Sequence, residues 1–502
     1  MLPASTANVR SRRNALEDIE MAEYPTSQRE GRAAVPQGCP TPGRTRSRGS
    51  SRGRNLAIHE LFGLGNQEER SRYPGVDRFF RHVEKECFPR FAEFDKAMWP
   101  LMNEVYTTSH SQQWKWCALV IRTCRRLQNS NPTVEELATE FLSAHGQENV
   151  SFGELGENVQ FAIVKALLHT LCWLSVTIMP VVEKQDLVDV RTPNGPAKAL
   201  SLTALYNGMK VSRPVTLNST LGQLFHQINQ AAVPIPMEEG GMDGQRFTRA
   251  TGDVVHEPCV TYTSLRKYAG VRLKWVSTLS EHLSLDRDTG VLSVFRYPSV
   301  CAVRIQNRNK CKVISNITNW LLPSRDYGWP NSVGNEERVC QQVILSYRLL
   351  FGQRTASRRR LKEELDELDK STEESTPYDP FILQCIGKVP STWRVWAGIA
   401  KPDTPFSAAT LPARCRRDDG FIKEWSTYFA WIHFSSFRWR LLAIQAFGND
   451  HSPAEFLGFL MDPRDPIRRD TARVSVLAVV LAVSFGTLQT SIAARQLMEV
   501  QP

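Results

Sequence analysis

The sequence lacks the short motifs that carry most known catalytic chemistries. It has no GK[ST] phosphate-binding loop, no HExxH pair, no EF-hand loop and no cysteine and histidine cluster with zinc spacing. Gly49, Ser51 and Gly53 spell a nucleophile-elbow pattern, but they lie in an Arg/Ser-rich stretch that cannot hold the strained turn of that motif. We therefore predict no catalytic, cofactor-binding or metal-binding residues and no enzyme; an enzyme with a spatially assembled site is the third alternative.

The sequence also lacks a secretory signal and any motif that pairs its cysteines. Met1 to Glu20 is polar and contains no apolar core region. The eleven cysteines are scattered without CxxC spacing, which is typical of reduced thiols that serve as small apolar side chains. We expect the bulk of the chain to face the cytosol.

Residues 1–56 are poor in aromatic and apolar side chains and rich in arginine, serine, proline and glycine. Such a segment cannot bury enough surface to offset its conformational entropy, so it is predicted to be a disordered basic arm. Much of the excess positive charge of the chain, which is +10 in total, lies here. Nuclear targeting, or electrostatic contact with lipid or RNA, is the alternative for this arm.

Residues 474–494 carry no charge at all. A helix of roughly 21 residues with a rise of about 1.5 Å each would cross a hydrocarbon core of roughly 30 Å. Its larger apolar residues contribute a gross insertion free energy of about 4 kcal/mol, part of which Ser, Thr and Gln in the second half take back. The run is predicted to be a single C-terminal membrane anchor, and a buried core helix is the alternative.

Arginines are distributed unequally around this run. Four precede it, and Arg495 alone follows it, so the side before the run is predicted to stay in the cytosol. The four are Arg464, Arg468, Arg469 and Arg473. The expected partner of the chain is a membrane, which residues 474–494 enter, and protein partners are expected in addition. The expected localisation is that of a single-pass membrane protein with a cytosolic body. The alternative is the cytoplasm or the nucleus.

The body, residues 57–350, is predicted to be mainly helical. Aromatic and aliphatic residues recur at helical spacing between Phe79 and Val120, and Thr133 with Glu136 is typical of a helix start. Residues 166–182 are apolar but too short for a span, and they are predicted to form a buried helix. A small β unit is expected near residues 262–303, with a hairpin turn over Asp286 to Gly290. The fold class is therefore mainly α with a small antiparallel β portion.

Two further segments follow the body. Residues 351–376 are basic at their start and acidic afterwards, with pairs such as Arg359 and Glu363 one turn apart, and they are predicted to be a charged helix or linker. Residues 377–473 are rich in tryptophan, tyrosine and phenylalanine, and they are predicted to form a juxtamembrane helical region whose rings suit a bilayer interface.

A function of a different class is compatible with the β unit. A helix from Ser264 to Tyr268 followed by β strands resembles a winged-helix DNA reader, and Arg272 and Lys274 would suit phosphate contacts. No clear recognition helix carries several base-reading side chains, so nucleic acid is disfavoured as a partner. A soluble nucleic-acid-binding regulator is nevertheless the second functional hypothesis.

Several stretches after residue 60 resemble a large group of uncharacterised filamentous-fungal proteins that have a C-terminal hydrophobic segment. The resemblance is carried by Leu265, Tyr268, Gly270, Val271, Trp275, His282, Leu283, Asp286 and the run from Phe295 to Cys301, by Leu350 to Gln353 with Arg358 and Arg359, by Arg440 to Leu442 with Gln445, and by Asp462, Arg464, Asp465, Arg468 and Arg469. The chain departs from the group at Thr471, Ala472 and Ser475, where the group is usually aromatic.

The resemblance implies cytosolic domains on a terminal membrane helix, with no assigned activity or catalytic residues. It also implies membership of variable accessory gene clusters, with a role in surface, growth or metabolite traits. The leading hypothesis is thus a membrane-anchored accessory or interaction protein without enzymatic activity.

The arginine asymmetry makes orientation testable. Replacing Arg464, Arg468, Arg469 and Arg473 with Glu, and adding two lysines after Ala494, should weaken or invert the orientation because topology follows the Lys/Arg bias near a span. Inverted molecules would expose the sequons at Asn149, Asn218 and Asn316 to the lumen and gain mass that a glycosidase removes. Glycosylated wild-type protein would show that the orientation is the reverse.

Overall fold

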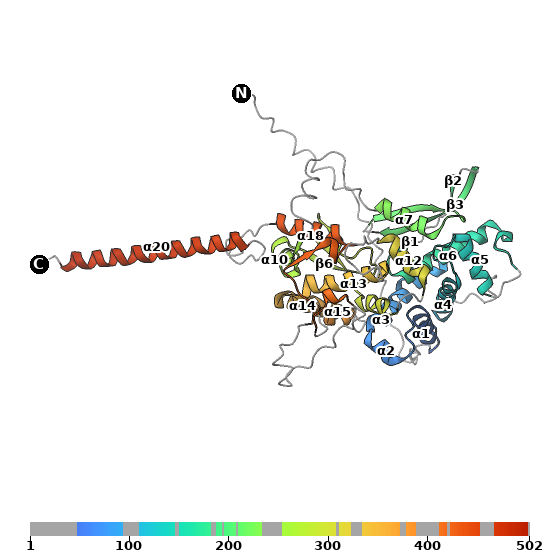
Figure 1. Ribbon diagram of the computed structural model, residues 1–502, viewed down its shortest axis with the longest axis horizontal. Helices are drawn as coiled ribbons and strands as arrows, with labels where there is room; N and C mark the ends of the chain where they lie inside the picture. The colour runs from blue at the N-terminus through green and yellow to red at the C-terminus, as the bar shows by residue number, and fades with distance from the viewer. Residues whose placement is uncertain are drawn as a thin grey trace, which may run out of the picture. The chain divides into compact units, whose positions relative to one another are not determined.

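The structure is a computed structural model of the chain. It describes residues 48–93, 110–145, 150–181, 187–192, 195–206, 209–232, 254–307, 311–322, 334–371, 378–387, 411–418, 422–451 and 466–499. The architecture is mainly α with small β-sheets, as predicted, and includes one long apolar helix late in the chain (Figure 1).

The first part of the body is helical. Its elements are α1 (Arg48–Phe62), α2 (Gln67–Arg72), α3 (Pro74–His82), η1 (Val83–Cys87), η2 (Phe88–Glu93), α4 (His110–Arg126), α5 (Val134–Ala144), η4 (Phe152–Glu154) and α6 (Glu157–Ser175). The beginning of α1 at Arg48 shows that the last residues of the predicted 1–56 arm are helical; residues 1–47 lie outside the described residues.

The aromatic residues of this part form a core, as their spacing predicts. The ring of Trp114 on α4 stacks on Phe80 at a centroid distance of 5.2 Å and meets the edge of Phe88 at 4.5 Å. All three side chains are buried. The predicted helix start at Thr133 is also confirmed, because its hydroxyl accepts from Glu136 N at 3.1 Å while the Glu136 carboxylate accepts from Thr133 N at 2.9 Å.

The prediction of one buried helix over residues 166–182 is wrong beyond Ser175. Helix α6 ends there, Val176 adopts a left-handed conformation with φ of 62°, and strand β1 (Met179–Val181) begins. Strands β2 (Leu187–Thr192), β3 (Gly195–Tyr206) and β4 (Met209–Val215) complete an antiparallel sheet in which β3 pairs with the other three. Helix α7 (Leu221–Ala232) follows. The central strand β3 was not predicted, because the Ala and Lys residues at its start disfavour a strand.

The expected β unit near residues 262–303 is present, with a different pairing. Strand β5 (Val254–His256), α9 (Glu257–Val260) and α10 (Tyr262–Ala269) precede β6 (Arg272–Val276), β7 (Leu285–Asp286) and β8 (Val291–Phe295). The predicted turn joins β7 and β8 in an antiparallel pair: Asp286 accepts from Asp288 N and from the Thr289 hydroxyl, and Gly290 has a φ of 65°. Strand β6 instead pairs parallel to β8, which differs from the antiparallel wing of a winged-helix reader.

The second part of the body surrounds a buried helix. It comprises α11 (Pro298–Gln306), α12 (Lys312–Leu321), α13 (Asn335–Tyr347), the π-helical η5 (Arg348–Gly352), α14 (Thr355–Ser371), α15 (Phe381–Ile386), η6 (Ala413–Cys415), β9 (Thr427–Phe429), α17 (Ala430–His433) and α18 (Arg438–Asp450). Helix α14 is the predicted charged helix, and Arg359 lies 3.8 Å from Glu363. Because Leu361 and Leu365 are buried, this helix packs on the core by one face.

The aromatic region of residues 377–473 belongs largely to the same core. Tyr428, Phe434 and Phe437 are fully buried, and β9 pairs with β5. Trp393 and Trp396 lie outside the described residues. The ten cysteines in the described ranges are free and buried, as predicted for reduced thiols.

Gly75 on α3 provides a test of this packing. A methyl group added at Gly75 would lie 2.1 Å from Asp379 Oδ2 and 2.3 Å from Ser299 Oγ, which join α11 to the segment before α15. We expect Gly75→Ala to lower the free energy of unfolding by about 3 kcal/mol, measured by urea denaturation, because the clash displaces buried hydrogen-bonding groups.

The matched control is Gly153→Ala, where the nearest atom to the added methyl group is Ser151 Oγ at 3.9 Å, an ordinary van der Waals distance. Its effect should stay within about 0.5 kcal/mol. Equal stability of the two variants would contradict the close approach at Gly75.

Candidate functional site

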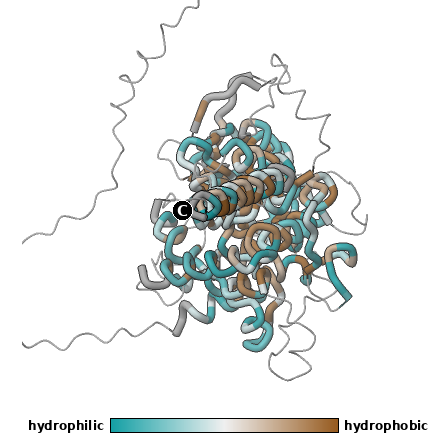
Figure 2. Tube along the Cα trace, turned by 90° about the vertical axis from the view of Figure 1, so that its left-hand side faces the viewer, coloured by the Kyte–Doolittle hydropathy of each residue, from teal (hydrophilic) through white to brown (hydrophobic). Residues whose placement is uncertain are grey.

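Helix α20 (Pro466–Glu499) is the feature that sets this chain apart from an ordinary soluble body. Residues Asp470–Gln496 are long and apolar enough to cross a membrane, and none of the tested apolar window is buried. Nine large apolar side chains are between 48% and 66% exposed: Val474, Leu477, Val479, Val480, Leu481, Val483, Phe485, Leu488 and Ile492. This exposure does not fit the alternative of a buried core helix. Figure 2 shows hydrophobic stretches along this helix, which is seen from its C-terminal end.

Hydroxyl groups in α20 donate hydrogen bonds to backbone carbonyls of the same helix. Ser475 donates to Thr471 O at 2.9 Å, Ser484 to Val480 O at 2.8 Å and Thr490 to Gly486 O at 2.7 Å. Thr487 and Ser491 bond in the same way to carbonyls three or four residues earlier. A hydroxyl that is already bonded to the helix backbone costs less to transfer into hydrocarbon than a free one.

The flanks of the apolar run are charged. Arg468, Arg469 and Arg473 lie in the first part of α20, and Arg495 lies after the run. Arg464, the fourth residue of the predicted cluster, lies outside the described residues. Arginine side chains at both ends of an apolar helix can extend toward lipid headgroups while the apolar part stays in hydrocarbon.

A second feature is a polar cavity between α11, α12 and α13. Its volume is about 210 Å³, and Lys312, Ser315 and Asn335 are among its lining residues. Arg304, a further lining residue, forms an ion pair with Glu336 and donates to Leu174 O at 2.8 Å. A space with so little apolar lining is typical of hydrated polar volume rather than of a small-molecule site, which is usually lined by apolar side chains.

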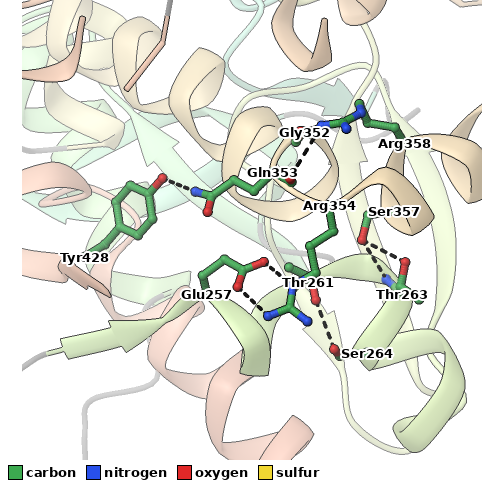
Figure 3. A network of polar contacts seen from close by, with 10 residues as sticks. All are labelled: Glu257, Thr261, Thr263, Ser264, Gly352, Gln353, Arg354, Ser357, Arg358 and Tyr428. Carbon is green, nitrogen blue, oxygen red and sulfur yellow. Dashed lines mark hydrogen bonds and ion pairs between the residues drawn. The ribbon is translucent and has the colours of Figure 1, made fainter. Parts of the chain in front are cut away.

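A third feature is a partly buried network of polar side chains around the contact between α10 and α14. Figure 3 shows the carboxylate of Glu257 facing the guanidinium of Arg354, and the two bonds measure 2.6 and 2.7 Å. The hydroxyls of Thr263 and Ser357 lie 2.7 Å apart, and Gln353 donates to Tyr428 OH. Bidentate arginine–carboxylate pairs fix geometry strongly. The network therefore joins α9 and β9 to the segment between η5 and α14, and α10 to α14.

Burial keeps several histidines and thiols of the core in their neutral forms. Burial lowers the pKa of His82, His169 and His282 to about 3, so these imidazoles are neutral near pH 7. Burial also raises the pKa of the described thiols Cys87, Cys117 and Cys172, which disfavours thiolates. Among the described residues, no group of three or more histidine, cysteine, aspartate or glutamate side chains is arranged to hold a metal ion.

No family model, curated protein or solved structure matches this chain. The resemblance to the filamentous-fungal group therefore stays a prediction. Of the three predicted sequons, Asn218 is exposed; the Asn316 amide donates to Ser130 O at 2.9 Å, and Asn149 lies outside the described residues. Neither the polar cavity nor the burial of Asp379 could be predicted from neighbouring residues. The cavity lining and the hydrogen-bond partner Ser299 of Asp379 come from distant parts of the chain.

Asp379 predicts an unusual pH dependence. Its carboxylate accepts from Ser299 N at 2.7 Å and from Phe381 N at 3.0 Å, and burial raises its pKa from 3.8 to about 6. The folded state therefore binds this proton more tightly than the unfolded state, and the stability contributed by the proton is lost as the pH rises from about 4 through about 6.

We expect Asp379→Asn to remove this loss, so that stability relative to wild type increases between pH 4 and 6 by on the order of 3 kcal/mol in urea denaturation. Asp286→Asn is the control. Hydrogen bonds from Thr289 lower the pKa of Asp286, so its contribution is lost as the pH falls, in the opposite direction. Parallel pH profiles for wild type and Asp379→Asn would refute the assignment.

Proposed function

We propose that this protein is a membrane-anchored accessory or interaction protein, in which α20 crosses a bilayer once and the folded body lies on the cytosolic side. The observation that carries the proposal is the exposure of α20, whose apolar side chains find no cover in the body. Full burial of each large apolar side chain is worth about 1.5–3 kcal/mol, so an apolar helix of this length requires an apolar environment.

The dimensions of α20 support a bilayer as that environment. The charge-free run of roughly 21 residues is about 31 Å long, close to the thickness of a hydrocarbon core. Its hydroxyl groups are bonded to the helix backbone, and arginines stand at both ends. The excess of arginine before the run favours a cytosolic body.

The accessory role rests on different arguments. The sequence lacks catalytic motifs, and burial holds His82, His169 and His282 and the thiols of Cys87, Cys117 and Cys172 in their neutral forms. The resemblance to filamentous-fungal proteins would add a conditional role in surface, growth or metabolite traits. The body would then act as a platform for protein partners at the cytosolic face of a membrane.

Carbonate extraction of the expressed full chain tests the anchor. Wild type should remain in the membrane pellet, and deletion of residues 474–494 should release the body. Val483→Arg places a charge near the centre of the run at a cost of about 2.5–3.5 kcal/mol and should release a large fraction, whereas the matched Val483→Leu should not.

Two outcomes would overturn the proposal. One is release of the wild-type chain as a soluble monomer. The other is release as a soluble oligomer whose assembly depends on residues 474–494, because a second copy would then cover α20 in place of lipid.

A further inference from the structure

Three large aromatic side chains in the last part of the body are exposed. Phe429 at the end of β9 is 47% exposed, Trp431 on α17 is 36% exposed and Trp439 on α18 is 54% exposed. They fall on three consecutive elements, and α17 packs against both β9 and α18. Their neighbours Tyr428, Phe434 and Phe437 are fully buried, so the exposure is specific to these three side chains rather than general to the aromatic region.

Basic residues outnumber acidic ones in this part of the chain. The described ranges 411–418 and 422–451 contain six arginines and lysines against three aspartates and glutamates. The guanidinium of Arg438 lies over the Trp439 ring, 4.4 Å from its centroid, so a cation and an amphipathic ring are in direct contact. Lys423 is exposed and Arg438 is half-buried; the Lys423 ammonium lies 5.5 Å from the centroid of the Trp425 ring.

The chain limits the distance between these aromatics and the membrane helix. Helix α18 ends at Asp450 and α20 begins at Pro466, so a connection of about 15 residues spans at most roughly 50 Å even when fully extended. If α20 spans a bilayer, this tether holds the body at a high effective concentration near the lipid surface. A modest interfacial affinity is then sufficient for docking.

We propose that Phe429, Trp431 and Trp439, together with Arg438 and Lys423, form a surface by which the body rests on the cytosolic leaflet of an anionic membrane. This inference rests on the proposed function. Tryptophan favours the headgroup region because its apolar body enters the acyl boundary while its N–H stays hydrated. Each basic side chain near an anionic surface adds about 1 kcal/mol, which screening by salt reduces.

The tryptophan distribution allows a direct measurement. Helix α20 contains no tryptophan, so all of the tryptophan fluorescence of the full chain comes from outside the span. The full chain is reconstituted in phosphatidylcholine and phosphatidylserine vesicles in which a brominated phosphatidylcholine carries the quencher close to the headgroup. Docking predicts that brominated lipid quenches part of the fluorescence and that Trp439→Phe together with Trp431→Phe removes at least half of the quenched fraction.

Three matched variants define the surface. Val188→Ser on β2 replaces a side chain of similar exposure, 40%, in the four-stranded sheet, and should leave quenching unchanged. Replacing Arg438 and Lys423 with Gln should reduce quenching in vesicles that contain phosphatidylserine and have little effect in vesicles of phosphatidylcholine alone. The Trp→Phe pair retains aromatic bulk, so circular dichroism should confirm that the variant is folded.

Vesicle flotation separates the two proposals. A chain that does not float with vesicles refutes the membrane anchor itself. A chain that floats without any quenching refutes the docking surface and leaves the anchor standing. Quenching that is unchanged in the Trp431 and Trp439 variant also overturns the inference, because a different surface of the body would then face the lipid.

Discussion

The body depends on one constraint: the polar side chains of a helix that is buried on all sides need partners from other segments of the chain. From Glu337 to Gly352, α13 and η5 are buried without interruption, and this stretch includes arginines and glutamines. Gln342 accepts from Ser436 N at 2.9 Å and donates to Ser435 Oγ at 3.1 Å, while Arg348 donates to Gly387 O and pairs with Glu424. An unpaired polar group at such depth costs about 1–3 kcal/mol, so these partners fix where the later segments must lie.

The same requirement explains how distant parts of the chain become one core. His282 bonds to Ser346 on α13 at 2.8 Å and accepts from Phe295 N at 3.2 Å, so the β unit is held to the central helix through a neutral imidazole. Arg354 and Glu257 join α9 to the segment that follows η5. The segments contribute apolar surface, and the polar contacts select one arrangement among the many that would bury it.

Helix α20 is the opposite case. It is apolar and exposed, whereas α13 and η5 carry several polar side chains and are buried. Its hydroxyl groups are bonded within the helix, and its apolar side chains lack cover. The body has a complete core without it. Because α20 contributes no side chain to the core of the body, it needs another apolar environment. Its length and composition are sufficient for crossing a bilayer.

Local signals in the sequence were sufficient for several elements. These are the capping box at Thr133, the turn over Asp286 to Gly290, the charged helix around Arg359 and the apolar run of α20. Each depends on residues that are close together in the sequence, so the sequence pattern is sufficient to predict it. Tertiary structure alone decided the sheet around β3, the parallel pairing of β6 with β8, the polar cavity and the raised pKa of Asp379. These features depend on pairing and burial between residues far apart in the chain, and neither strand partners nor local dielectric can be inferred from neighbours along the sequence.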